Sequence, residues 1–398
     1  MKNQLIQEIQ AYIRAENIEN ASKRLVDLTW YYHRNENFHS KSIDLRKNYN
    51  ESKLLGHQVS GESKDLLLQS CEALLAEIPM MDEANSDSGQ LGKPLIEING
   101  LAKKFHHGRS FQFGPIDMQI NKGDIVGIVG ENGNGKTTYL KLLIEEIAKD
   151  AGEMVHHYHL HDIEAPEIYK RKNRVAYVPQ RVPKWRGTLK ENLVYYAASH
   201  GVSAEENDAY VEYVIHRMGL TTFIDLKWSQ LSSGYKLRFE LAKMLVWQPE
   251  ILVLDEPLAN LDIQATQNLL SDLKFLAESH IHPIAIILTS QQLHEVEQIS
   301  NKVLFLRNGA PVFAGSQADF IASRAYKIVE FSVKNDANKA MQLLQDWADQ
   351  IDPIHEIIKV KFNEEKTSTE LLQILIENQL EISYFRDISD STIQLFNE

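Results

Sequence analysis

Cysteine, basic charge and long apolar runs are all scarce in this sequence. Its single cysteine, Cys71, cannot form a disulfide within the chain and suits a reducing compartment. The formal net charge of −13 at pH 7 argues against a broad contact with nucleic acid or with an anionic membrane. No apolar run approaches the roughly 18 residues that a membrane helix needs, and residues 1–8 are too polar for a secretory signal. We therefore expect a cytoplasmic chain that reaches a membrane only through a partner.

The rest of the composition is that of a multidomain globular protein. With 398 residues, 43% of them hydrophobic and 24% charged, the chain is long enough for two or three domains. Apolar residues recur at helical spacing through residues 1–80, which predicts an all-α bundle. Nothing in this stretch looks catalytic, and we interpret it as a protein-interaction module. Residues 81–93 are small, polar and aperiodic, as in a linker. Strand and helix patterns then alternate through an α/β domain at 94–324 and a small α+β accessory domain at 325–398.

A glycine-rich motif at residues 130–138 is the most informative stretch. It reads GENGNGKTT, follows an apolar run at 125–129 that predicts a buried strand, and precedes an amphipathic run at 139–144 that predicts a helix. In a strand, glycine loop and helix, backbone N–H groups and a helix N-terminus converge on phosphate oxygens. We therefore expect Lys136 to bind the β- and γ-phosphates of a nucleotide and the Thr137 hydroxyl to ligate Mg²⁺. The nucleotide-binding residues expected in this motif are Gly130, Asn132, Gly133, Asn134, Gly135, Lys136, Thr137 and Thr138.

Two carboxylates form the second chemical feature. Asp255 and Glu256 directly follow the apolar run 251–254, so they are expected at the carboxyl end of a central strand, where α/β sheets build their sites. Transfer of a γ-phosphoryl group to water needs a carboxylate for Mg²⁺, which predicts that role for Asp255. It also needs a group that orients or deprotonates the water, and Glu256 is the neighbouring candidate.

Together these motifs resemble those of the nucleotide-binding subunits of ABC transporters, over roughly residues 94–315. The resemblance implies an α/β P-loop NTPase fold, an ABC ATPase core with a helical subdomain, that binds ATP and Mg²⁺. It implies that Phe105 stacks on the adenine ring and that Thr138 contacts the α-phosphate. Gln180 ends a predicted strand at 174–180 and matches the glutamine that contacts Mg²⁺ and communicates with the membrane subunit.

The same resemblance implies a composite site made by two subunits. The run LSSGY at 231–235 stands where the family has its LSGGQ signature, and it keeps Ser232 and Gly234, which in the family approach the γ-phosphate held by the opposite subunit. Leu261 and Asp262 match the D-loop of the family. We therefore expect a homodimer or pseudo-dimer that sandwiches two nucleotides head to tail.

One position departs from the family pattern in a way that bears on catalysis. The family places a histidine after its last buried strand, and this sequence has Gln291 there; His294 follows on the next predicted helix. A glutamine amide can donate a hydrogen bond to a phosphate, but it cannot titrate. We therefore count Gln291 with Glu256 as a catalytic residue and expect ATP hydrolysis to be slow.

A histidine run offers a separate hypothesis. His157, His159 and His161 lie on one face of a predicted strand within residues 156–161. Such a face could hold a metal ion, but a solvated strand face in the small antiparallel sheet of the family is the alternative that we favour.

Two functions follow from the resemblance. The first is an ATP-binding subunit that drives a separately encoded permease from the cytoplasmic face of the inner membrane; the tail at 325–398 resembles the accessory domain of exporter-type members. The alternative is a soluble ATP-dependent switch or adaptor without a permease. The bundle at 1–80 and the slow hydrolysis expected from Gln291 favour the switch. The bundle resembles the effector-associated adaptor domains of bacterial ATPases and would recruit a protein partner.

Overall fold

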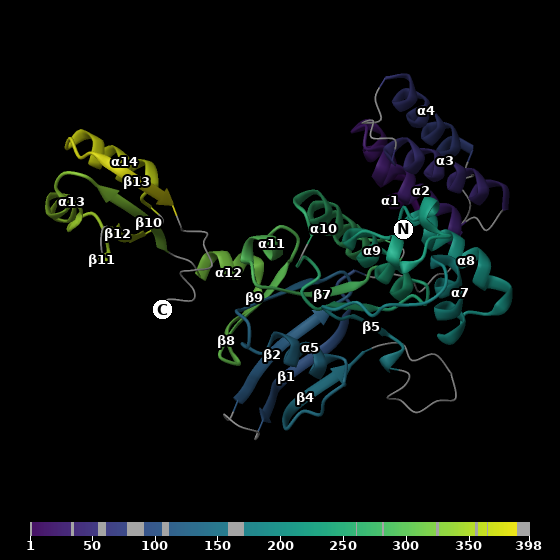
Figure 1. Ribbon diagram of the computed structural model, residues 1–398, viewed down its shortest axis with the longest axis horizontal. Helices are drawn as coiled ribbons and strands as arrows, with labels where there is room; N and C mark the ends of the chain where they lie inside the picture. The colour runs from purple at the N-terminus through teal and green to yellow at the C-terminus, as the bar shows by residue number, and fades with distance from the viewer. Residues whose placement is uncertain are drawn as a thin grey trace. The chain divides into compact units, whose positions relative to one another are not determined.

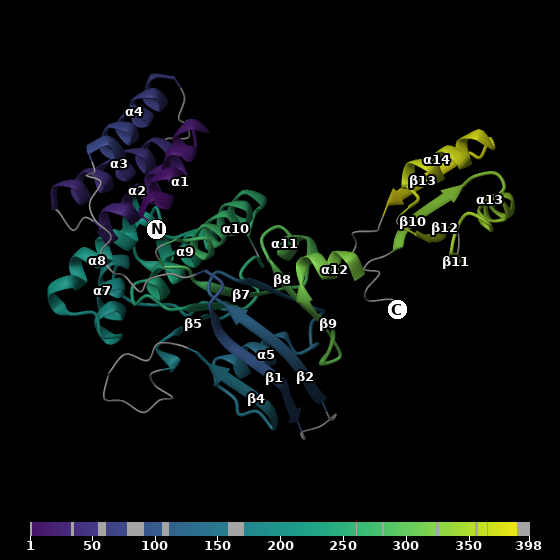
Figure 2. The same cartoon turned by 180° about the vertical axis from the view of Figure 1, so that it is seen from behind.

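The protein was analysed as a computed structural model, drawn in Figures 1 and 2. It describes residues 2–32, 36–54, 61–77, 91–105, 111–157, 171–259, 261–280, 282–323, 326–354, 357–363 and 365–387. The chain divides into two compact units, which are described separately. The first contains Met1–Val126 and Thr137–Thr289, and the second contains Gly127–Lys136 and Ser290–Glu398. Within the described ranges, no helix combines the length and the apolar character needed to cross a membrane.

The first unit begins with a bundle of helices, as the helical spacing predicts. Its elements are α1 (Lys2–Arg14), α2 (Ile18–Tyr32), α3 (Glu36–Leu54) and α4 (Glu62–Glu77). Their apolar faces share one core, which includes Leu5, Leu25, Leu45 and Cys71. Cys71 is fully buried there, and burial raises the pKa of its thiol to about 12. Most of the predicted linker, residues 81–90, lies outside the described residues.

A three-stranded antiparallel sheet follows, with the order β2-β1-β4. Its strands are β1 (Pro94–Phe105), β2 (Phe111–Asn121) and β4 (Ala151–His156). The alternating run at 95–99 reads as an edge strand, and this interpretation is wrong because β1 is the middle strand. Alternating apolar and polar residues show that one face of a strand is solvated, but they do not show whether the strand has one neighbouring strand or two.

Short parallel strands form the centre of the first unit. β5 (Val175–Val178) pairs with β6 (Ile251–Leu254), and β6 pairs with β7 (Ala285–Ser290). The order continues to β3 (Ile125–Val129), the strand predicted at those residues, whose first residues belong to this unit. Every residue of β6 and β7 is buried, as expected of parallel strands covered on both faces. Helix α5 (Lys136–Leu143) follows β3 along the chain, and together these elements confirm the α/β P-loop fold.

Helices make up the remainder of the first unit. The helical run predicted from residue 188 to 247 is divided into α7 (Leu189–Ser199), α8 (Ala204–Arg217) and α9 (Ser233–Leu245), with short 3₁₀ turns before α9. Gly201 and Gly219 follow the first two helices with positive φ angles, and glycine adopts this helix-ending conformation without steric strain. Helix α10 (Ile263–Ala277) lies between β6 and β7 in sequence. Both views in Figures 1 and 2 place α8 beside the bundle, where α2 and α3 contact it.

The second unit contributes strands to two sheets and also contains the helices that accompany these strands. β8 (Lys302–Arg307) pairs with β9 (Ala310–Ser316) and neighbours β3, whose last residues belong to this unit. Helices α11 (Leu293–Glu297) and α12 (Gln317–Ser323) flank these strands in sequence, and Val129, Val296, Phe305 and Phe320 share a core.

The tail of the second unit has the chain order β-α-β-β-α-β and the sheet order β11-β12-β10-β13. Apolar residues from one face of this sheet and from both helices form a single core. The sequence pattern of the tail predicts a first helix that reaches Trp347 and a last helix at 387–396, but no strand at 350–354. The structure has a strand there, β11, and its first helix ends at Leu344; the last predicted helix lies almost entirely outside the described residues. The elements are β10 (Tyr326–Val333), α13 (Ala337–Leu344), β11 (Gln350–Ile354), β12 (Ile357–Asn363), α14 (Ser368–Glu377) and β13 (Ile382–Asp387).

Candidate functional site

The glycine loop begins where β3 ends, at Gly130. A Cβ atom at Gly130 would lie 2.7 Å from the Leu306 carbonyl oxygen, so no larger residue fits without a shift of the backbone. Gly133 and Gly135 have φ angles of 83° and 96°, in the left-handed region that glycine adopts without strain. The side-chain oxygen of the buried Asn134 accepts a hydrogen bond from the Asn308 backbone N–H at 3.1 Å. The loop is therefore shaped by its glycines and tied down by one asparagine.

Lys136 is folded back onto the loop that precedes it. Its buried ammonium donates to the Gly130 carbonyl oxygen at 2.6 Å and to the Glu131 carbonyl oxygen at 3.2 Å. Asn132 and Gly133 at the loop tip are exposed. A cation is thus held against a loop of backbone groups, which is the arrangement that binds phosphate oxygens.

Asp255, at the carboxyl end of β6, is the centre of a polar cluster in the first unit. Thr137 donates from its hydroxyl to Asp255 Oδ2 at 3.0 Å, and Thr289, at the end of β7, donates to Asp255 Oδ1 at 2.9 Å. Burial and then the charge of Asp255 raise the pKa of the Tyr177 hydroxyl, on β5, to about 12. The sequence motif therefore does bring Thr137 and Asp255 together, and the two residues supply adjoining hydroxyl and carboxylate oxygens.

Glu256 is held in an unusual backbone conformation beside this cluster. Its φ angle is 47°, which is uncommon outside glycine and costs about 1–3 kcal/mol, a cost that contacts with the surroundings must offset. Its backbone N–H donates to Thr289 Oγ1 at 2.7 Å, and its carboxylate oxygen Oε2 accepts from Gln180 Nε2 at 2.8 Å. The structure thus joins Gln180 directly to Glu256, a contact that the sequence alone did not predict.

Sequence reasoning missed Thr289 and Tyr177. Thr289 bonds both Asp255 and Glu256, because parallel strands β6 and β7 end at the same edge of the sheet. A hydroxyl residue directly after the apolar run 284–288 was the available signal for Thr289.

The signature run and the D-loop line a groove of about 310 Å³ in the first unit. The Ser232 hydroxyl caps α9 by accepting from the Tyr235 N–H at 3.4 Å, and the Asp262 carboxylate caps α10 by accepting from the Ala265 N–H at 2.8 Å. Tyr235, the departure at the end of the signature, packs its ring against that of Phe223 at a tilt of 34°, with centroids 3.9 Å apart. Two capped helix N-termini therefore open on one groove, which Gly234 and Leu261 also line.

The remaining predicted residues are Phe105, Thr138 and Gln291. Phe105 ends β1, and its ring lies 6.1 Å from that of Phe111. Thr138 lies in the first turn of α5 and is half-buried. Gln291 is exposed and precedes α11 in the second unit.

The histidine run is described only in part. His156 and His157 pair with Glu145 and Glu97, at 3.0 and 3.2 Å, whereas His159 and His161 lie outside the described residues. Among the residues that are described, no group of three or more acidic, histidine or cysteine side chains could hold a metal ion.

The chain is similar in sequence to known ATP-binding proteins. The family model described as ABC transporter matches residues 113–259. Nod factor export ATP-binding protein I of Burkholderia thailandensis is 32% identical and covers 52% of this chain and 67% of that relative. The uncharacterized ABC transporter ATP-binding protein YdbJ of Bacillus subtilis is 29% identical, over 55% of this chain and 68% of the relative. Methionine import ATP-binding protein MetN 2 of Enterococcus faecalis is 25% identical over 75% of this chain and 89% of the relative.

A solved structure shares the fold. CbiO1 from Clostridium perfringens, described as part of the ABC transporter complex CbiONQ, superimposes with a TM-score of 0.52 and 21% identity. The superposition covers 58% of this chain and 92% of CbiO1.

Proposed function

Because the chain belongs to the ATP-binding family of ABC transporters, we propose that it hydrolyses MgATP at a head-to-tail dimer interface and thereby drives a separately encoded permease. On this proposal the chain works at the cytoplasmic face of the inner membrane, attached through that permease. The observation that carries the proposal is the cluster in which Asp255 holds Thr137 and Thr289 while Glu256 holds Gln180.

The cluster fits a magnesium ion by its chemistry. Mg²⁺ prefers oxygen ligands and is bound through one or two carboxylates together with substrate phosphates. Thr137 Oγ1 and Asp255 Oδ2 are such oxygens, and they already lie 3.0 Å apart. Gln180 adds a side-chain amide next to Glu256. Thr137, Asp255 and Gln180 are therefore the residues that would hold Mg²⁺, which when bound would neutralise charge that develops on the phosphates.

The chain's own residues divide the remaining work. Lys136 and the backbone of residues 130–135 bind the phosphates, because a loop N–H and an ammonium both favour negative charge. Phe105 stacks on the base, and Thr138 contacts the α-phosphate. Glu256 accepts a proton from the attacking water or orients it. Gln180 holds its carboxylate, and Thr289 holds its backbone N–H. Gln291 donates a hydrogen bond to the γ-phosphate without titrating, so hydrolysis is slow.

The groove at the N-termini of α9 and α10 completes the site of a second copy. Ser232 and Gly234 present a hydroxyl and helix N-terminal amides, which suit a phosphate. In this proposal, ATP contacts made only in the dimer drive closure, and hydrolysis releases it.

A Glu256→Gln variant tests the sandwich directly. The substitution keeps the size of the side chain and its bond with Gln180 but removes the base, so turnover should fall at least about 10²-fold while MgATP still binds. Light scattering at saturating MgATP should then report a trapped dimer. Glu153→Gln, an exposed acid on β4, is the matched control and should behave like the parent. A variant that stays monomeric with MgATP bound would falsify the dimer mechanism.

A soluble ATP-dependent switch is the second candidate, and the buried attachment of the N-terminal bundle to the ATPase core favours it. Affinity purification from detergent-solubilised membranes separates the two functions. A co-purifying protein with several membrane helices supports transport, whereas recovery of soluble partners alone supports the switch.

A further inference from the structure

Helix α2 of the N-terminal bundle is buried on two sides. Its apolar residues Leu25 and Leu28 belong to the core of the bundle. Its charged residues Lys23, Arg24 and Asp27 are only 4%, 1% and 2% exposed. Charged side chains are almost never this deeply buried unless they are paired. Lys23 and Arg24 pair with Glu19 and Glu8 inside the bundle, and Lys23 and Asp27 also pair with residues in the ATPase part of the same unit.

One group of contacts anchors the bundle to α8 and to the end of α10. Asp27 accepts hydrogen bonds from Tyr213 Oη and from Arg217 Nε, both at 2.7 Å. Arg24 donates to the Phe275 carbonyl oxygen at 3.2 Å, and its guanidinium carbon lies 3.7 Å from the centroid of the Phe275 ring. These contacts attach the bundle firmly, but they do not touch the signature helix α9.

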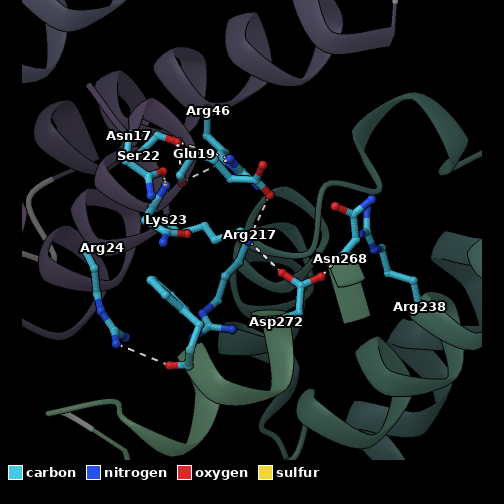
Figure 3. Close-up of polar contacts among 12 residues, drawn as sticks. Asn17, Glu19, Ser22, Lys23, Arg24, Arg46, Arg217, Arg238, Asn268 and Asp272 are labelled. Carbon is cyan, nitrogen blue, oxygen red and sulfur yellow. Dashed lines mark hydrogen bonds and ion pairs between the residues drawn. The ribbon is translucent and has the colours of Figure 1, made fainter. Parts of the chain in front are cut away.

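A second group of contacts does reach α9, through Asp272 on α10. Lys23 Nζ donates to Asp272 Oδ1 at 2.6 Å, and Arg238 Nη2, from α9, donates to Asp272 Oδ2 at 3.1 Å. Figure 3 shows Asp272 with Lys23 and Arg238 among these polar contacts. Burial acts to raise the pKa of Asp272, but the charges of Lys23 and then Arg238 outweigh burial and hold the pKa below its ordinary value. One buried carboxylate is thus shared by a cation of the bundle and a cation of α9.

Arg238 connects this carboxylate to the groove. It lines the same groove as Ser232 and Asp262, the residues that cap α9 and α10. Asp272 lies on α10 and Arg238 on α9, so the position of one helix relative to the other depends on this pair. Lys23 stabilises the pair from outside the two helices.

We propose that the N-terminal bundle sets the relative position of α9 and α10 for ATP turnover, with Lys23 and Asp272 as positioning residues. The inference rests on the proposed function, because it concerns the groove that would meet the nucleotide of a second copy. Without Lys23, Asp272 keeps only Arg238 of these two cationic donors. The pair then loses its contact with the bundle, so α9 and its cap can shift relative to α10. Misplacement of a reacting group by about 1 Å can cost about 10²-fold in rate.

The test compares variants of the full-length protein. Lys23→Met keeps the length of the side chain and removes its charge, and Asp272→Asn removes the shared charge. Each should lower kcat at least about tenfold and leave the affinity for MgATP, measured by calorimetry, within about twofold. The double variant should lose no more than Asp272→Asn alone, because both substitutions break one connection. Lys23→Arg, which keeps the charge, should restore most of the turnover.

Tyr213→Phe is the matched control. It removes a buried hydrogen bond from the same interface without touching Asp272 or Arg238. Its thermal midpoint should fall, and its kcat should stay within about twofold of the parent. An equal loss of kcat in Tyr213→Phe and Lys23→Met would show that any loosening of the bundle slows turnover, and would overturn the role of Asp272.

The remaining outcomes separate this inference from the proposed function. A parent protein that neither binds nor hydrolyses MgATP refutes the proposed function itself. An active parent combined with a Lys23→Met variant of unchanged kcat refutes only the role of the bundle. If Lys23→Met does not fold, Asp272→Glu keeps every charge and moves the carboxylate by one methylene group. Unchanged kcat in that folded variant would also overturn the inference.

Discussion

Among single residues, Thr289 joins the two acids that were expected to share the chemistry. Its hydroxyl donates to Asp255 and accepts from the backbone N–H of Glu256, and the residue is fully buried. Thr289→Val removes the hydroxyl and leaves an N–H and a carboxylate oxygen without this partner. We expect a loss of about 1.5–3 kcal/mol in unfolding free energy, since one of the bonds involves a charge. Turnover should fall as well, because Glu256 loses a bond that supports its left-handed backbone.

Thr289→Ser is the control for that substitution. It keeps the hydroxyl and removes only a methyl group, so turnover should stay near that of the parent. Urea unfolding and steady-state ATPase assays measure the two effects. Equal turnover in the valine and serine variants would contradict the role of the hydroxyl.

Gln291 is the residue whose substitution by histidine should raise the rate of hydrolysis. An imidazole there would donate to the γ-phosphate and could also carry a proton, whereas the amide can only donate. We therefore expect Gln291→His to raise kcat and to add a pH dependence near the ordinary histidine pKa, about 6.5. His294→Gln, at an exposed histidine on α11, is the control and should change neither. Turnover in Gln291→His no higher than in the parent counts against slow hydrolysis through Gln291.

At the scale of elements, patterns of burial were predictable and pairing was not. The fully apolar runs 125–129 and 251–254 are the buried strands β3 and β6, and the spacing of apolar residues located α1 to α4. By contrast, β1 was read as an edge strand and β11 was missed. Residues 350–354 read QIDPI, and a proline and an aspartate disfavour a strand there; β11 forms because it pairs with β12 at the sheet edge, where a proline is tolerated.

The polar face of α2 shows a second limit of sequence patterns. Lys23, Arg24 and Asp27 are residues that an amphipathic helix normally turns to water. Instead they are buried against α8 and α10 of the same chain. A sequence read alone does not reveal that a charged face has its counter-charges 190 and 249 residues away. The role of Asp255 and Glu256 was easier to predict, because the apolar run that places them at the end of a strand directly precedes them in the sequence.

At the scale of the first unit, two buried histidines and two buried aspartates make stability fall as the solution is acidified. Burial lowers the pKa of the His216 and His282 imidazoles below the ordinary 6.5. Neutral histidine is therefore favoured in the folded state, and this stability is fully present above pH 6.5 and is lost as the pH falls. Asp27 and Asp272 have lowered pKa values, since their arginine and lysine partners outweigh the effect of burial. Their contribution is present above their ordinary 3.8 and is lost below it.

Stability should consequently fall in two stages as the solution is acidified. Between pH 7 and 5 each buried histidine contributes a slope of up to about 1.4 kcal/mol per pH unit, and the aspartates add a second decline below about pH 4. His282→Gln keeps a donor for the Pro249 carbonyl, which His282 Nε2 approaches at 3.1 Å, but removes the titration. Urea unfolding at pH 8, 7, 6 and 5 should show a smaller slope for that variant than for the parent, with His294→Gln unchanged. If the unfolding free energy of the parent instead rises between pH 7 and 5, the folded state must raise the pKa of these imidazoles rather than lower it, and this prediction is wrong.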